Sequence, residues 1–169
     1  MSTTIVTTGK RPGTLTAMLA AVAVGAIAAI ISAIHTYGSG KELAREIFAK
    51  ELGQEADGLA KSLMGSLYET QVASAYETLS ARAGFGLFFA IGLILFGLLA
   101  RNAATWARVL ITLFAVFGAL AQVMTLGDPG SPSLLSGLSA VSMAAWLAAA
   151  VLCWLPGNNR FAKAHKAMR

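Results

Sequence analysis

The sequence predicts an all-α integral membrane protein: a four-helix bundle with an extracytoplasmic helical hairpin between its first and second membrane-spanning helices. Hydrophobic residues make up 56% of the 169 residues and charged residues only 12%, whereas a soluble domain carries about 25% charged residues. The charges lie between long uncharged runs. Four of these runs are close to the roughly 20 residues that a helix needs to cross the hydrocarbon core of a bilayer.

Four apolar segments are expected to cross the membrane as helices, because lipid offers the backbone no hydrogen-bond partners. The predicted spans are residues 14–37, 83–100, 109–126 and 133–155. These runs are continuously apolar and lack the alternation of a membrane β-barrel strand. The first run is longer than the apolar part of a cleaved signal peptide, so we expect it to remain as the first helix.

The distribution of charge predicts that both termini face the cytoplasm, because basic residues favour that side. The tails 1–13 and 156–169 and the loop 101–108 contain eight basic residues and no acidic residue. The segment 38–82 and the turn 127–132 contain all eight acidic residues of the chain. An even number of spans places these two groups of segments on opposite sides of the membrane.

The segment 38–82 is predicted to form an amphipathic helical hairpin outside the membrane. Residues 39–42, Ser-Gly-Lys-Glu, have the pattern of a capping box that opens a helix, and Gly53 and Gly58 predict a break. Apolar residues at spacings of three and four then predict a second helix. Because no turn signal separates it from the second span, this helix is expected to continue over about residues 59–100. A segment lying on the outer leaflet is the alternative arrangement.

The apolar stripe of the second outer helix is the candidate interaction face. Two interpretations fit it: a structural cap over the bundle, or a docking face for a partner protein. The candidate residues are Leu63, Leu67, Tyr68, Val72 and Tyr76.

Small residues recur at four-residue spacing in two spans, and such stripes let the backbones of membrane helices approach closely. They are candidates for helix packing, either within the chain or between copies of it. The stripes are Ala21, Gly25, Ala29 and Ala33 in the first span and Ser136, Ala140, Ala144 and Ala148 in the fourth.

The polar side chains within the spans are uncharged. The four spans contain no Lys, Arg, Asp or Glu, whereas transporters and proton pumps usually place ionisable residues within the membrane. Gln122 is expected to hydrogen-bond across helices, and His35 is expected at the outer interface. An ion-coupled transporter is therefore disfavoured.

The sequence predicts no catalytic, cofactor or metal site. The two histidines, His35 and His165, lie at opposite ends of the predicted topology, and Cys153 is the only cysteine, so neither a metal site nor an intramolecular disulfide is expected. Phosphate-binding loops and hydrolase motifs are not found. The basic residues flank apolar spans instead of forming one patch, which argues against nucleic acid as a partner.

Two short stretches flank the alanine-rich spans: RPGTLTA at residues 11–17, ahead of the first span, and CWLPGN at residues 153–158, at the end of the fourth. Together with the spans, they resemble small four-helix membrane proteins of high-GC actinobacteria, most of them uncharacterised. The resemblance implies a bacterial cytoplasmic (inner) cell membrane and a four-helix fold. It implies no activity and no functional residues.

These observations favour a non-enzymatic membrane accessory or interaction protein that acts through its external helical segment or through oligomerisation. An oligomeric channel or transport component, with small residues and serines lining a passive pathway, is the alternative. A further alternative is a lipid or small-ligand sensor with a groove between the external helices and the bundle. The expected partners are membrane lipid and either further copies of the chain or another membrane protein.

Overall fold

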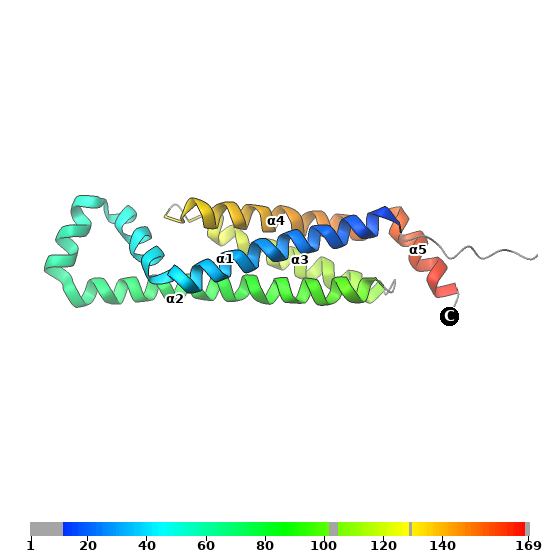
Figure 1. Ribbon diagram of the computed structural model, residues 1–169, viewed down its shortest axis with the longest axis horizontal. Helices are drawn as coiled ribbons and strands as arrows, with labels where there is room; N and C mark the ends of the chain where they lie inside the picture. The colour runs from blue at the N-terminus through cyan, green and yellow to red at the C-terminus, as the bar shows by residue number, and fades with distance from the viewer. Residues whose placement is uncertain (1–11, 102–104, 129, 168–169) are drawn as a thin grey trace, which may run out of the picture.

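The computed structural model describes residues 12–101, 105–128 and 130–167. These residues form five α-helices and no strand (Figure 1). The helices are α1 (Gly13–Leu52), α2 (Gln54–Ala100), α3 (Thr105–Leu126), α4 (Ser133–Cys153) and α5 (Pro156–Ala167). The structure confirms the predicted all-helical fold and the packing together of four long apolar helices.

The bundle consists of α1 to α4 running along the long axis of the molecule (Figure 1). The main contacts within the bundle are α1–α2, α2–α3, α3–α4 and α4–α1, so the four helices follow one another around it. At one end α5 follows α4, and we call this the α5 end. At the other end α1 and α2 extend past α3 and α4 as a pair of helical arms, and we call this the hairpin end.

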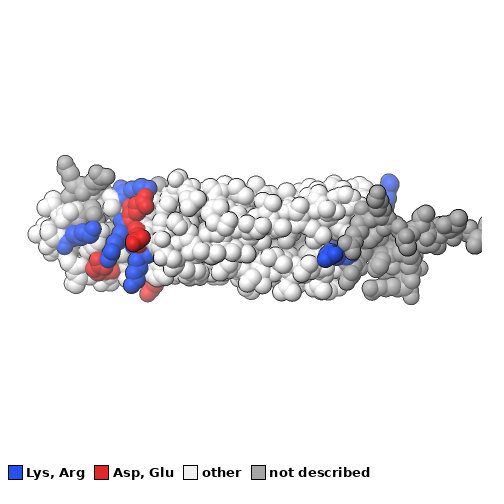
Figure 2. All heavy atoms as spheres, viewed as in Figure 1, with Lys and Arg blue, Asp and Glu red and all other residues white. Residues whose placement is uncertain are grey.

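Each of α1 to α4 contains a stretch long and apolar enough to cross a membrane. The 21 residues of α4 extend over about 32 Å at 1.5 Å per residue, close to the roughly 30 Å of a hydrocarbon core. On the face shown in Figure 2, charged side chains gather towards the two ends and leave a long uncharged middle. Large apolar side chains that are exposed occur on all four helices, among them Ile27, Ile34, Phe88, Ile91, Phe117, Leu120, Val141 and Val151.

The centre of the bundle is organised around Trp146, which is fully buried. Its indole ring lies against Gly25 of α1 and Gly118 of α3, and a Cβ atom added at either glycine would collide with the ring. The two glycines therefore let α1 and α3 approach the largest side chain of α4. On the α2–α3 side, Phe114 packs against the rings of Phe89 and Phe96, with ring centroids 5.7 Å and 5.0 Å apart.

The helical arms depart in detail from the predicted hairpin. α1 continues to Leu52 and kinks at Ser39, where φ is −123° and ψ is 16°; the flanking glycines Gly38 and Gly40 weaken the helix there. The chain turns at Gly53, whose φ of 82° suits glycine best. The break expected at Gly53 and Gly58 lies at Gly53, since Gly58 is within α2, and α2 has a further kink at Gly65.

The segments at the α5 end also differ in extent from the predicted ones. α3 begins at Thr105, so the last residues of the loop expected at 101–108 are helical. α4 ends at Cys153, and the predicted tail 156–169 contains α5. Pro156 is the first residue of that helix, a position at which its missing N–H is not needed.

Candidate functional site: the hairpin and its junction with the bundle

The two helical arms form a hairpin with an apolar core of its own. The core links both arms to the bundle, because one of its members, Leu135, belongs to α4. Phe48 of α1 meets Tyr68 of α2 edge to face, with ring centroids 5.4 Å apart. The buried residues of this core are Leu43, Ala44, Ile47, Tyr68, Val72, Leu79 and Leu135. The hairpin is therefore a packed structure rather than an extended loop.

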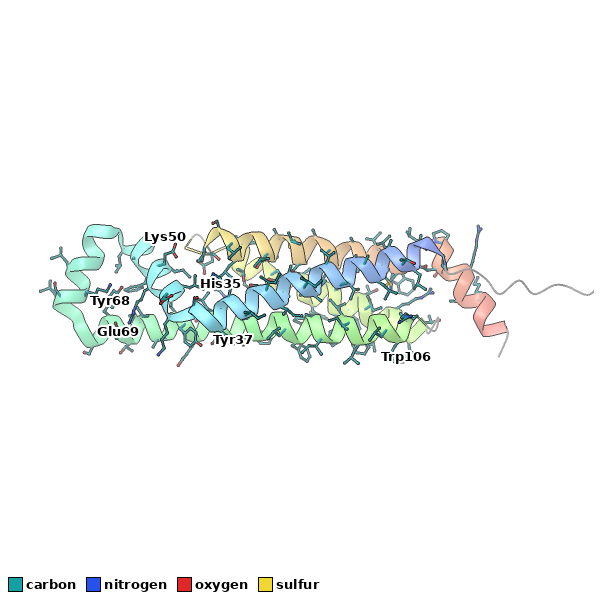
Figure 3. The ribbon with its side chains drawn as sticks, in the orientation of Figure 1. His35, Tyr37, Lys50, Tyr68, Glu69 and Trp106 are labelled. Carbon is teal, nitrogen blue, oxygen red and sulfur yellow. The ribbon has the colours of Figure 1, made fainter. Side chains whose placement is uncertain are left out.

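Polar contacts also join the arms. Nη2 of Arg45 donates to both carboxylate oxygens of Glu69 at 3.2 Å, and the Tyr37 hydroxyl donates to the carbonyl of Ser80 at 3.1 Å. Figure 3 shows Tyr68 and Glu69 projecting from α2 towards the α1 arm. Because the Arg45–Glu69 pair is exposed, it contributes at most about 1 kcal/mol. The apolar core contributes most of the stability of the hairpin.

The predicted interaction face is divided by this packing. Tyr68 and Val72 are buried in the hairpin core, and Tyr76 packs beside them against Gly40. Leu63 and Leu67, by contrast, remain 80% and 60% exposed. The kink at Gly65 interrupts the stripe between Leu63 and Leu67, and Leu67, one position before Tyr68, is rotated from it by about 100° around the helix.

A third leucine joins the exposed pair. Leu59 is 61% exposed and precedes Leu63 and Leu67 at four-residue intervals. Leu59 and Leu63 share one helical face before the kink at Gly65, and Leu67 follows the kink. We call Leu59, Leu63 and Leu67 the leucine patch.

An ion pair ties the hairpin end of α2 to the turn between α3 and α4. Nη1 of Arg82 donates to Oδ2 of Asp128 at 2.8 Å, and Oδ1 of Asp128 accepts from the backbone N–H of Gly130 at 3.1 Å. A groove of about 140 Å³ lies between the hairpin and the bundle on one side of this pair, lined by Phe48 and Leu79 among others. The groove lies where the sequence analysis expected one for a ligand sensor.

A smaller cavity, of about 30 Å³, lies inside the bundle and shares Leu79 and Arg82 with the groove. Its polar lining side chains are Ser32, Thr36, Arg82, Gln122, Thr125, Ser139 and Ser142. Ser142 donates to the carbonyl of Gly25 at 3.2 Å. Gln122, Thr125 and Ser139 are buried and make no side-chain hydrogen bond with any residue that the structure describes. The cavity is large enough for water, which would satisfy them.

Gln122 therefore differs from its expected role. The sequence predicts a hydrogen bond from Gln122 across helices, whereas the structure places its amide at the cavity, near Gly86 of α2. Gly86 has no side chain that the amide could bind. His35 is half-buried on α1 near the hairpin end (Figure 3).

The two small-residue stripes lie differently. In α1, Gly25, Ala29 and Ala33 are buried and Ala21 is half-buried. In α4, Ser136 is half-buried, whereas the alanines of the stripe are exposed; they are Ala140, Ala144 and Ala148. Successive helix positions are separated by about 100°, so burying Trp146 turns the alanines two positions before and after it away from the bundle. The α4 stripe is thus left outside the contacts within the chain.

A polar cluster joins four helices at the α5 end. Arg108, at the start of α3, is only 2% exposed. Its Nη2 donates to the carbonyl of Asn158 at 2.6 Å and its Nη1 to Oδ1 of Asn159 at 3.1 Å. The Asn158 side chain accepts from Thr14 of α1 at 2.8 Å and donates to the carbonyl of Leu152 at 2.8 Å. The stretch 153–158 therefore has a structural role, connecting the helices at the α5 end. The sequence alone could not indicate this role, because Thr14 and Arg108 are distant from the stretch in the chain.

Comparison with protein families, with curated proteins and with solved structures gave no match. Within the described part of the chain, His, Cys, Asp and Glu form no group of three or more that could hold a metal ion.

Proposed function

We propose that the protein is a multi-pass integral membrane protein in which α1 to α4 cross the bilayer. The supporting observation is the exposed apolar surface of all four helices, because soluble monomers rarely expose apolar patches larger than a few hundred Å². The basic α5 end faces the cytoplasm and the hairpin faces the opposite side. Alkaline extraction tests insertion: the protein is expected to stay with the membrane pellet, and release into the supernatant would contradict it.

The leucine patch lies too far along the hairpin to be covered by lipid. Arg82 and Asp128 mark the hairpin end of the apolar belt. Leu67 precedes Arg82 by 15 positions in α2, which corresponds to about 22 Å of helix. Figure 1 shows this part of α2 continuing along the long axis of the bundle.

The chain accordingly acts as a non-enzymatic interaction protein that presents the leucine patch to a partner protein. The carrying observation is the exposure of three leucines on a hairpin that already has its own packed core. Complete burial of a leucine side chain contributes about 2 kcal/mol, so a partner with an apolar helical face gains affinity by covering the patch. The partner is another protein of the same membrane or a second copy of this chain.

Site-specific photo-crosslinking tests this function. A photoreactive residue at position 63 is expected to give one adduct of defined mass in native membranes, and the mass distinguishes a second copy from another protein. Leu67→Glu should abolish that adduct, whereas Gln71→Glu, an equal change of charge at an exposed position of the same arm, should leave it intact. An adduct that survives Leu67→Glu, or the absence of any defined adduct, would contradict docking through the patch.

The polar cavity favours a second candidate, a component that passes a small uncharged solute. Its observation is the set of hydroxyl and amide side chains that line the cavity, among them Gln122, Thr125 and Ser139. Osmotic swelling of proteoliposomes tests it, and flux that is equal in wild-type protein and Ser139→Val would contradict it. The interaction function is better supported, because the α5 half of the bundle is filled by a continuous apolar core that includes Met18, Leu93 and Ile111.

A further inference from the structure

A half-open apolar groove runs between α1 and α2 in the α5 half of the bundle. It has a volume of about 300 Å³. Leu19 and Val22 of α1 form one wall, and Ile94 and Leu98 of α2 form the other. Gly97 forms part of its floor: a Cβ atom added there would lie 3.5 Å from Leu19, in ordinary contact. The groove exists because no side chain extends from Gly97 to fill it.

One end of the groove is positively charged. Arg101 lines it there, is exposed and makes no side-chain hydrogen bond or ion pair with any described residue. Thr16, in the first turn of α1, lines the same end. The segments expected at this side of the membrane contain eight basic residues and no acidic residue.

We propose that this groove is a specific site for an anionic phospholipid, with one acyl chain between α1 and α2 and the phosphate bound by Arg101. The inference rests on the membrane insertion proposed above. From Ile94 to Arg101 the groove follows α2 for about 10 Å, so the chain lies at hydrocarbon depth while the phosphate meets the guanidinium at the interface. A guanidinium suits this role because its fork of donors matches phosphate oxygens.

Anionic lipid is favoured over zwitterionic lipid by the charge at this end. Each basic residue near the surface attracts anionic headgroups, whereas the trimethylammonium of phosphatidylcholine is repelled by the same residues. The groove also buries the apolar surface of an acyl chain, which a free phosphate does not have. The site therefore requires both the headgroup and the chain.

Native mass spectrometry of the full chain in mild detergent tests the proposal by titration with phosphatidylglycerol or phosphatidylcholine of the same acyl chains. The wild type is expected to bind its first phosphatidylglycerol molecule about fivefold more tightly than its first phosphatidylcholine molecule. Arg101→Gln should remove this preference. Arg160→Gln, which removes an exposed basic residue of the same end, should keep it. Glycerol 1-phosphate, which has no acyl chain, should not displace the bound lipid.

Filling the groove provides a second, independent variant. Gly97→Leu is expected to lose binding of the first lipid of either class, whereas Gly137→Leu, at an open position of α4, should bind as the wild type does. Equal affinity of the wild type for the two lipids, or equal losses in Arg101→Gln and Arg160→Gln, would overturn the site. Alkaline extraction separates the two proposals: a chain released from the membrane overturns both, and a retained chain without lipid preference overturns only this one.

Discussion

The contact between Gly25 and Trp146 gives the sharpest prediction of how the bundle is held together. In Gly25→Ala, the new methyl group collides with the indole ring of Trp146, which is fully buried. Overpacking of this kind costs about 1–3 kcal/mol. Replacing glycine by alanine within a helix also adds about 1 kcal/mol of helix propensity, so the net loss of stability is smaller than the cost of the collision.

Gly137→Ala separates the two contributions. The chemical change is the same and also lies within a helix, but nothing lies within 4 Å of the added Cβ. The difference in unfolding free energy between the two variants therefore isolates the collision, and we expect Gly25→Ala to be less stable than Gly137→Ala by about 1–3 kcal/mol.

The assay is reversible unfolding by sodium dodecyl sulfate in mixed micelles, followed by circular dichroism. Trp146→Phe removes part of the ring, so adding it to Gly25→Ala should recover much of the difference in a double-mutant cycle. Equal stability of Gly25→Ala and Gly137→Ala, or a cycle without coupling, would refute the packing of α1 on Trp146.

Three further predictions concern the ends of the bundle, and the same unfolding assay measures each. Asn158→Ala removes two side-chain hydrogen bonds at a buried position and should lower the free energy of unfolding by about 1–3 kcal/mol. A loss below roughly 0.5 kcal/mol would argue against a structural role for the polar cluster at the α5 end. Arg82→Gln and Asp128→Asn should show a coupling of about 1 kcal/mol that falls in high salt, and an uncoupled cycle would contradict the ion pair. Gly53→Ala should cost about 1–3 kcal/mol because its φ of 82° and ψ of 146° lie in a region that residues other than glycine rarely adopt, whereas Gly58→Ala, within α2, should not destabilise the protein.

The apolar helices could be predicted from the sequence because their signal is local. Each run has the length and composition that a membrane helix needs, and the four helices of the structure contain those runs except for the last two residues of the fourth. The spacing of Tyr68, Val72 and Tyr76 likewise indicated one side of an outer helix, and the structure places these residues at the hairpin core.

The rotation of each helix in the bundle could not be predicted, because it depends on distant partners. The spacing of Ala140, Ala144 and Ala148 resembles that of the buried α1 stripe, yet burial of Trp146 turns these alanines outward. The Arg108–Asn158 contact joins residues that are 50 positions apart. The cavity near Gln122 is formed only when four helices pack together, so no local sequence pattern predicted that its lining side chains would lie near one another.

The central proposal is a bundle inserted in the membrane with its hairpin on the side opposite α5. Single cysteines introduced at Ser66 in the hairpin, Lys163 in α5 and Leu113 in the apolar belt, in a Cys153→Ala background, measure this directly with a membrane-impermeant thiol reagent. In intact cells with an accessible inner membrane, the cysteine at position 66 should be labelled, and the one at 163 only after permeabilisation. The cysteine at 113 should remain unlabelled in both conditions. Labelling of 163 in intact cells, or of 113 in either condition, would contradict the account.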